Sequence, residues 1–232
     1  MHNIMQSDSN IIALKKISKI FNKGEPNQVK AVVDLSFEVQ VNQCILIKGP
    51  SGSGKSTLLS IIGCLAKPTE GEYICLDHKV SRWSEKFLTR FRHEHIGMIF
   101  QNFNLINGLT VSENIGLPLL PTNLSAKKIS DKALHSARHL QIEHRLTFKS
   151  DTLSGGEMQR LAIARALVND PDIIIADEPT AHLDTVLSKN ILKLFSDLKT
   201  EGKTLIIATH DSLVENHQMV DRIFSMRDGR LE

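Results

Sequence analysis

The order of hydrophobic and polar positions along the chain predicts strands that alternate with helices. Leu35, Phe37 and Val39 alternate with polar residues, which is the period of a half-buried strand and favours an antiparallel element near the N-terminus. Apolar runs without alternation predict strands buried on both faces, at 44–49, 72–76, 96–100, 172–176 and 203–208. Helical stretches lie between them, at about 55–65, 157–168 and 185–200. The pattern predicts an α/β fold with a mainly parallel sheet and helices on both faces.

The segment from about 104 to 150 has a different pattern. It has few strand signals, and Thr110 and Glu113 have the spacing of a capping box at a helix start. Residues 125–140 have helical composition. We therefore expect one domain over 1–232, in which 11–100 and 151–232 form the catalytic core and 101–150 form an inserted helical subdomain.

Residues 49–56 read G-P-S-G-S-G-K-S, the phosphate-binding pattern G-x-x-x-x-G-K-S/T, between a predicted strand and a predicted helix. The glycines let the backbone wrap around phosphate oxygens, and the N–H groups of the first helical turn point inward. Lys55 supplies a positive charge for the β- and γ-phosphates, and Ser56 offers a hydroxyl to Mg²⁺. We expect ATP to be bound by Gly49, Pro50, Ser51, Gly52, Ser53, Gly54, Lys55, Ser56 and Thr57.

The run I-I-I-A-D-E-P at 173–179 supplies what a phosphate-binding loop needs for hydrolysis. Four apolar residues predict a central strand, and Asp177 lies at its end, where it can hold Mg²⁺. Glu178 follows and can take the proton of the attacking water or orient that water. Alone, an Asp-Glu pair fits a solvated strand end equally well; beside the loop around Lys55 it predicts catalysis.

The sequence L-S-G-G-E at 153–157 predicts a second anion-binding element. Ser154 and Glu157 fit a capping box before a helix over 157–168, so a simple helix start explains these two residues. It does not explain Gly155 and Gly156, which weaken a helix start unless another group approaches the backbone closely. A helix N-terminus with free N–H groups attracts phosphate. Two antiparallel copies of the chain would let each such element complete the other copy's site.

Together these segments resemble the ATP-binding-cassette ATPases. The sequences GPSGSGKST, LSGGEMQR, IIIADEP and AHLD, with Gln101 and His210, occur in the order and spacing of that family over about 11–232. The resemblance implies an α/β fold of the P-loop NTPase kind, with an N-terminal antiparallel β-subdomain and an inserted helical subdomain. It implies ATP hydrolysis with ATP and Mg²⁺ bound, and a homodimer.

The resemblance also implies individual roles. Phe21 corresponds to an aromatic residue that stacks on adenine, and Gln101 to a glutamine that senses Mg²⁺ and the attacking water. Ser154, Gly155 and Gly156 would contact the γ-phosphate bound by the other copy. Asp184 corresponds to a residue at the dimer seam, and His210 to a histidine that contacts the γ-phosphate. One departure is His182, where the family more often has a small residue.

A finer resemblance is to the branch that contains lipoprotein-release and macrolide-efflux ATPases. It rests on 49–72, 96–120 and 210–231. Members of that branch act with transmembrane subunits that have large extracytoplasmic domains. The resemblance therefore implies a separate permease, a position at the cytoplasmic face of the inner membrane, and export or extraction of lipoprotein, peptide or macrolide. The permease would dock a short cytoplasmic helix near 101–120.

Composition narrows the alternatives. The 232 residues include 28 Lys and Arg against 26 Asp and Glu, a net charge of +2 that does not argue for a nucleic-acid partner. No window approaches the roughly 18 apolar residues that span a bilayer, and MHNIMQSDSN is not a secretory signal. Cys44, Cys64 and Cys75 are expected to be buried thiols, and the histidine pairs lack the partners of a metal site.

Two other functions stay open at this point. Some cassette ATPases act on nucleic acid or ribosomes, and these usually carry coiled-coil insertions, a zinc module or two cassettes, none of which has a signal here. A nucleotide-binding regulator without turnover would lack a catalytic residue, whereas Glu178 and His210 are both present.

Overall fold

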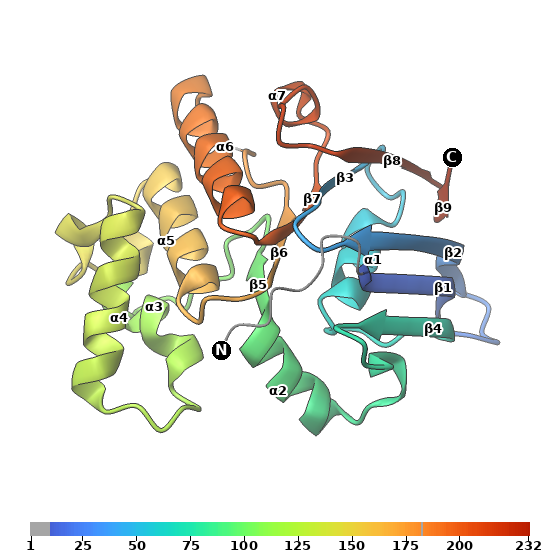
Figure 1. The fold of residues 1–232 in the computed structure, drawn as a ribbon, viewed down its shortest axis with the longest axis horizontal. Coiled ribbons are helices and arrows are strands. Elements are labelled where there is room, and N and C mark those ends of the chain that lie inside the picture. Colours follow the sequence, from blue (N-terminus) through green and yellow to red (C-terminus); the bar gives the residue numbers. More distant parts are fainter. Residues whose placement is uncertain (1–9, 182) are drawn as a thin grey trace.

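The fold is that of a computed structural model, which describes residues 10–181 and 183–232. Two sheets lie side by side in Figure 1. The first is antiparallel, with the order β2-β1-β4, and consists of β1 (Asn10–Phe21), β2 (Val29–Gln40) and β4 (Glu70–Cys75). This sheet confirms the expected N-terminal antiparallel element. The alternation around Phe37 belongs to β2, whose partner β1 was not predicted from the pattern.

The second sheet has the order β5-β6-β7-β3-β8-β9. Its first five strands are parallel, and β9 is antiparallel to β8. The strand bounds are Ile96–Ile99 for β5, Ile173–Asp177 for β6, Thr204–Ala208 for β7, Cys44–Lys48 for β3, Arg222–Arg227 for β8 and Arg230–Leu231 for β9. The mainly parallel sheet expected from the short apolar runs is confirmed.

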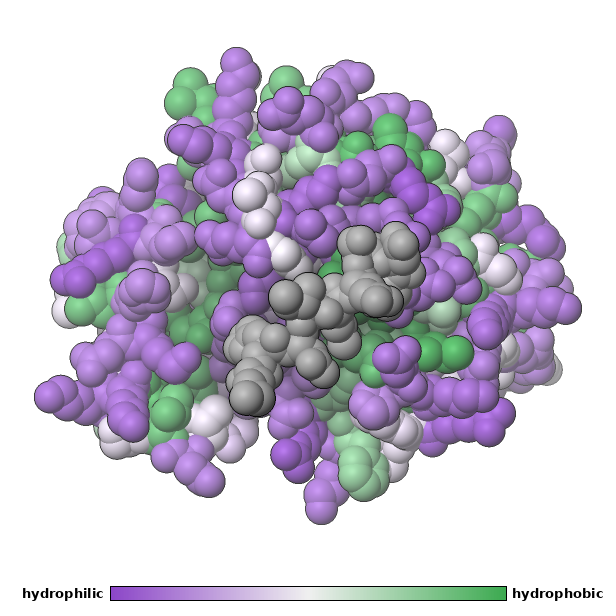
Figure 2. All heavy atoms as spheres, in the orientation of Figure 1, coloured by the Kyte–Doolittle hydropathy of each residue, from purple (hydrophilic) through white to green (hydrophobic). Residues whose placement is uncertain are grey.

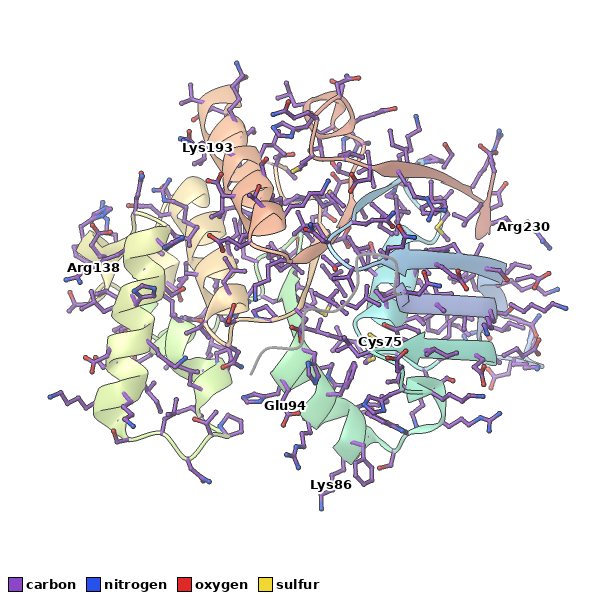
Figure 3. The ribbon with its side chains drawn as sticks, in the orientation of Figure 1. Cys75, Lys86, Glu94, Arg138, Lys193 and Arg230 are labelled. Atoms are coloured by element: carbon purple, nitrogen blue, oxygen red, sulfur yellow. The ribbon has the colours of Figure 1, made fainter. Side chains whose placement is uncertain are left out.

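Successive residues of the parallel strands face two separate cores. In β3, Ile45 and Ile47 belong to a core shared with the antiparallel sheet and α1 (Lys55–Ile62). Leu46 lies between them and faces the other core, with α5 (Gly155–Leu167) and α6 (Thr185–Thr200). Burial on both faces explains why these strands are continuous apolar runs. Hydrophilic side chains cover most of the face shown in Figure 2, and the sticks in Figure 3 extend outward from both sheets.

Helices fill the segment between β5 and β6. They are α3 (Val111–Gly116), η2 (Leu117–Leu119), α4 (Ala126–His139), η3 (Glu143–Arg145) and η4 (Ser150–Thr152), and with α5 they form the left part of Figure 1. The capping box at Thr110 and Glu113 is present at the start of α3. Further helices are η1 (Val80–Arg82), α2 (Glu85–His95) and α7 (Ser212–Glu215). The inserted helical lobe is therefore confirmed.

The start of α5 corrects one prediction. We expected the glycines of the S-G-G segment to precede a helix over 157–168, but α5 begins at Gly155. Ser154 is the N-cap: its Oγ accepts from the backbone N–H of Glu157, and a Glu157 carboxylate oxygen accepts from the backbone N–H of Ser154. This box satisfies two end groups and holds both glycines in the first helical turn, despite their low helix propensity.

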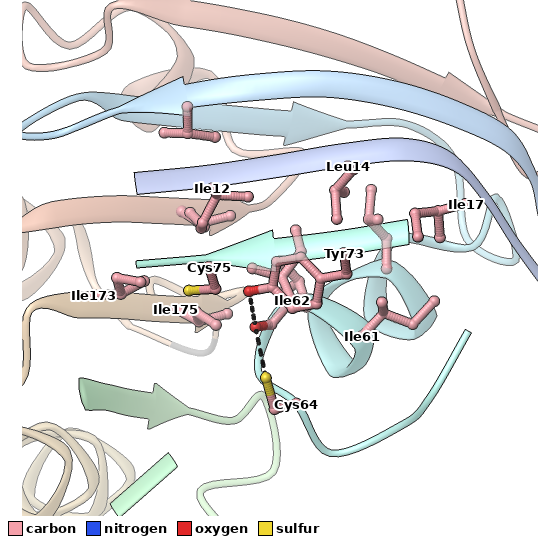
Figure 4. Packing of buried hydrophobic residues seen from close by; sticks show 14 of the residues in the cluster. Ile12, Leu14, Ile17, Ile61, Ile62, Cys64, Tyr73, Cys75, Ile173 and Ile175 are labelled. Carbon is pink, nitrogen blue, oxygen red and sulfur yellow. Dashed lines mark hydrogen bonds between the residues drawn. The ribbon is translucent and has the colours of Figure 1, made fainter. Parts of the chain in front are cut away.

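The three cysteines are buried free thiols, as expected. Burial raises the pKa of each thiol to about 12. Figure 4 shows Cys64 and Cys75 beside the fully buried Tyr73. The Tyr73 hydroxyl donates to the carbonyl oxygen of Ile62 over 2.7 Å, which ties β4 to the end of α1. These groups anchor the helix that follows the phosphate-binding loop to the antiparallel sheet.

The capping box at α5 predicts a pH-dependent contribution to stability. Hydrogen bonds from the Ser154 backbone and from Arg145 lower the pKa of Glu157 from 4.5 to about 2. A carboxylate whose pKa is lower in the folded state stabilises that state above the unfolded pKa and loses this effect as pH falls through the folded pKa. Glu157→Gln should therefore lower the free energy of unfolding at neutral pH, and its difference from wild type should shrink from pH 4.5 towards 2.

Urea unfolding at a series of pH values measures this difference. Glu143→Gln is the matched control, because Glu143 is exposed and forms no ion pair within the described part of the chain. A Glu157→Gln deficit that stays constant over the acidic range would contradict the assignment.

Candidate active site

A cleft of about 760 Å³ lies where the parallel strands β3, β6 and β7 end. The loop of residues 49–54 follows β3 and leads into α1, which begins at Lys55. Gly49 and Gly54 have positive φ, and a Cβ would lie 2.1 Å from the Met226 carbonyl oxygen at the first and 2.2 Å from the Ala31 carbonyl oxygen at the second. Only glycine permits this close packing of the loop against β8 and β2.

Lys55 is largely buried in the wall of the cleft. Its Nζ donates to the carbonyl oxygens of Gly49 and Pro50 over 2.7 and 3.0 Å. These bonds join the start of the loop to the lysine at its end, so the Lys55 ammonium group lies against the loop backbone. Ser56 and Thr57, the next residues of α1, also line the cleft.

Asp177 and Glu178 leave the end of β6 into the same cleft. Burial raises the pKa of the Asp177 carboxyl, and the nearby Ser56 hydroxyl only partly offsets this effect. The two side chains thus form one polar unit at the edge of the sheet. A partly desolvated carboxylate beside a hydroxyl is a donor set suited to a hard cation such as Mg²⁺.

Burial and two hydrogen bonds hold the Glu178 side chain in one orientation. It is 8% exposed and has a φ of 49°. One carboxylate oxygen accepts from the Thr209 hydroxyl over 2.7 Å, and the other lies 2.8 Å from Nδ1 of His210, whose side chain is 78% exposed. Left-handed backbone at a non-glycine residue is strained and is typical of functional sites. Thr209 and His210 come directly after β7, so neighbouring strand ends fix the carboxylate.

Gln101 reaches the cleft from the end of β5, and its loop is clamped from α5. Phe103 and Asn104 both have positive φ, 59° and 49°. The Arg165 guanidinium donates to their two carbonyl oxygens, over 2.7 Å to Phe103 and 2.6 Å to Asn104. A planar fork with two fixed donors suits such a turn better than a single ammonium. The turn after Gln101 is therefore tied to the helix that begins beside Ser154.

The structure brings most of the predicted site residues together. The cleft is lined by Gly49, Pro50, Ser51, Gly52, Gly54, Lys55, Ser56, Thr57, Gln101, Asp177, Glu178 and His210. Ser53 belongs to the same loop, but it is buried and does not line the cleft. Phe21 does not line the cleft; it is 43% exposed at the end of β1 and pairs with Val29, which does line it.

The remaining predicted residues lie away from the cleft. Ser154, Gly155 and Gly156 are at the start of α5, which lies across the central strands from α1 in Figure 1. A Cβ at Gly156 would lie 2.5 Å from Leu187 Cδ2 of α6, so this glycine has a packing reason within the chain, whereas a Cβ at Gly155 would meet nothing. Asp184 caps α6 by accepting from the Leu187 N–H. His182 is outside the described residues.

Several cleft residues were not predicted. Lys30 and Ala31 of β2 and the turn at Asp228 and Gly229 form part of its wall. The Asp-Gly pair is a hairpin signal that marks a turn, and β8 and β9 meet there. No local pattern places β2 beside the loop, because that contact is between distant segments.

None of the helices in residues 10–181 and 183–232 is both long and apolar enough to cross a membrane.

Comparisons with known proteins agree with this geometry. Residues 32–181 match the family described as ABC transporter. The chain is 43% identical to an uncharacterized ABC transporter ATP-binding protein of Thermotoga maritima, over 96% of this chain and 94% of that protein. It is 37% identical to the macrolide export ATP-binding/permease protein MacB of Hyphomonas neptunium, over 95% of this chain but only 34% of MacB.

A solved structure gives the same result. The ATP-binding cassette MJ0796, described as a dimeric post-hydrolysis state bound to ADP and Pi, superposes with a TM-score of 0.89 at 39% identity, over 95% of this chain and 96% of that one. The cleft combines a phosphate-binding loop with an Asp-Glu strand end, and the family match spans both. The chain therefore belongs to the ABC transporter family and is one of its ATP-hydrolysing, ATP-binding cassettes.

Proposed function

We propose that this cassette works as a face-to-face homodimer that drives a separate transmembrane permease at the cytoplasmic face of the inner membrane. One observation carries the proposal: the cleft unites the loop around Lys55 with Asp177 and Glu178, while the element at Ser154 lies outside it. An antiparallel pair would bring the Ser154 element of each copy to the other's cleft. The dimers described for MJ0796 support this arrangement.

The residues of the cleft fit ATP with Mg²⁺. Ser53 Oγ is buried and has no hydrogen-bond partner among the described residues, so it is a donor that a phosphate oxygen would satisfy. Ser56, Gln101 and Asp177 offer hydroxyl, amide and carboxylate oxygens, the ligands that Mg²⁺ prefers. When bound there, the ion would neutralise charge on the β- and γ-phosphates. Phe21 would stack on adenine from the end of β1, beside Val29 of the cleft wall.

Different side chains of the cleft then have different roles in hydrolysis. Lys55 binds the terminal phosphates, and Glu178 accepts the proton of the attacking water. The bonds from Thr209 and His210 hold the two Glu178 oxygens in a fixed direction, which lowers the cost of orienting the water. With ATP bound, the His210 ring would turn to the γ-phosphate, and its 78% exposure leaves room for this motion.

ATP hydrolysis would open the dimer, because the γ-phosphate contacts both copies of the chain. Ser154, Gly155 and Gly156 of one copy would contact the phosphate that Lys55 and His210 hold in the other, with Asp184 at the seam between them. Hydrolysis removes this link, so the closed pair loses the contacts that favoured it. A difference of about 5.5 kcal/mol is enough to convert a mostly closed population into a mostly open one.

The transmembrane partner and its substrate are proposed from the relatives. MacB combines an ATP-binding part with a permease, and the cbiO1 structure, with a TM-score of 0.82 at 28% identity, is described as part of a transporter complex. We assign to this chain a permease with an extracytoplasmic domain and a lipoprotein, peptide or macrolide substrate. Its short cytoplasmic helix would occupy a cavity of about 220 Å³ between α2, β5 and the helical lobe, which we call the docking groove.

Lys55→Ala should reduce ATP hydrolysis by about 100-fold or more, since removing one charge that faces a transferring phosphate costs this much. Phosphate release by the purified protein measures the effect. Lys193→Ala, at an exposed position on α6, is the control and should keep the wild-type rate. Equal rates for Lys55→Ala and wild type would show that the cleft is not where ATP is hydrolysed.

Glu178→Gln should slow turnover about 100-fold or more while ATP still binds, because it removes the general base and keeps the side-chain shape. With ATP and Mg²⁺ this variant should accumulate as a dimer in light scattering. With ADP it should be a monomer. A Glu178→Gln protein that remains monomeric with ATP and Mg²⁺ contradicts the face-to-face mechanism.

Arg165→Ala should lower kcat about tenfold or more, because releasing the turn at Phe103 and Asn104 misplaces Gln101. KM for ATP should change little, since the loop around Lys55 is untouched. Arg165→Lys, which keeps one donor, should be intermediate, and Arg138→Ala on the exposed face of α4 should be neutral. If KM rises as much as kcat falls, the clamp is not acting through Gln101.

A further inference from the structure

The docking groove has two walls that meet through one hydrogen bond. His93 of α2 and Pro118 of η2 both line the cavity, and His93 Nε2 lies 2.7 Å from the Pro118 carbonyl oxygen. Asn169 Nδ2 donates to the His93 carbonyl oxygen over 3.1 Å. Bonds within the chain thus fix the two walls relative to each other.

An exposed apolar side chain lies near each of these two groove residues in the chain. Phe87 lies six residues before His93 on α2, about 9 Å along the helix axis, and is 61% exposed. Leu120 lies two residues after Pro118 and is 64% exposed. Phe87 and Leu120 are thus among the large apolar side chains that the described residues leave exposed.

Both apolar residues have lysines near them in the chain that form no ion pair among the described residues. Lys86 precedes Phe87, and Lys127 and Lys128 begin α4 shortly after Leu120. Within the described residues none of the three forms a salt bridge, whereas Lys199 and Lys203 are paired with aspartates. Residues 117–132 contain three lysines and one acid, Asp131, which makes no ion pair in the described structure. We call Lys86, Phe87, Leu120, Lys127 and Lys128 the basic rim.

The two parts of the rim lie at the same edge of the molecule. In Figure 1 the N-terminal end of α2 and the link from η2 to α4 both reach the lower edge. Figure 3 shows Lys86 at this edge and Lys193 at the opposite one, and Figure 2 shows apolar side chains beside hydrophilic ones along the lower edge. A flat membrane that lies along this lower edge, parallel to the direction of view, would meet both parts of the rim.

We propose that the basic rim contacts the anionic headgroups of the membrane that holds the permease. This inference rests on the proposed function, because a permease seated in the groove brings the bilayer to the rim on both sides. Lysines close to an anionic leaflet are attracted to it, and exposed Phe and Leu side chains enter the boundary between headgroups and acyl chains. The rim would orient the cassette on the membrane while the groove binds the permease.

Vesicle sedimentation of the full chain tests the proposal without ATP or a permease. Binding to vesicles of phosphatidylcholine mixed with phosphatidylglycerol should exceed binding to pure phosphatidylcholine and should fall as salt is raised. Lys127→Gln/Lys128→Gln should weaken this binding about 25-fold, since each lysine near the surface contributes about fivefold. Lys189→Gln/Lys193→Gln removes the same charge from exposed positions on α6 and should bind like wild type.

Three outcomes would overturn the proposal. These are no preference of wild type for anionic vesicles, equally weak binding by both double variants, and wild-type binding by the rim variant. A rim variant that binds vesicles normally but loses stimulation of ATP hydrolysis by the permease would assign the lysines to an acidic protein segment instead. Failure of ATP hydrolysis by wild type would contradict the proposed function and leave the vesicle result unaffected.

Discussion

The alignment of parallel strand ends is the constraint on which the rest of the structure depends. In the pairing of β3 with β7, Ile47 lies opposite Ala208, and in the pairing of β6 with β7, Asp177 lies opposite the same residue. Three segments far apart in the sequence therefore end at one line across the sheet. The loop around Lys55, the carboxylates after β6 and the pair Thr209 and His210 all begin from this line.

This alignment also explains how a strained carboxylate is kept in place. Glu178 has a left-handed backbone and is 8% exposed, a costly arrangement for a charged residue. The Glu178 N–H donates to the Ala208 carbonyl oxygen over 2.8 Å, and hydrogen bonds from Thr209 and His210 satisfy the carboxylate. The strain is held by the sheet, so the fold itself orients the carboxylate that we propose as the general base.

A second rigid link runs from the cleft to the helical lobe. Arg165 ties the turn after Gln101 to α5, and Gln159 Nε2 of the same helix donates to the Pro179 carbonyl oxygen over 2.8 Å, directly after Glu178. The helix that begins at the Ser154 cap is thus bonded at two points to segments that carry cleft residues. These bonds connect the helix to both segments, which is the kind of link that the proposed transmission between nucleotide and permease requires.

The sequence alone determined the elements and the chemistry whose signals are local. Continuous apolar runs identified the buried strands, the glycine-rich loop identified Lys55 and Ser56, and the strand end identified Asp177 and Glu178, because each motif depends only on neighbouring residues. The run L-S-G-G-E identified the Ser154 element in the same way, and the resemblance to a known family then supplied Gln101 and His210. It gave no sign of the Arg165 clamp.

Only the tertiary structure decided what depends on contacts between distant segments. It placed β2 and the turn at Asp228 in the wall of the cleft, gave Gly156 a packing partner in Leu187, and moved the start of α5 to Gly155 through the capping box at Ser154. It also left Phe21 outside the lining of the cleft. Local sequence fixes which conformation a segment prefers, but the neighbours that complete a hydrogen bond or limit a side chain come from parts of the chain that only folding brings together.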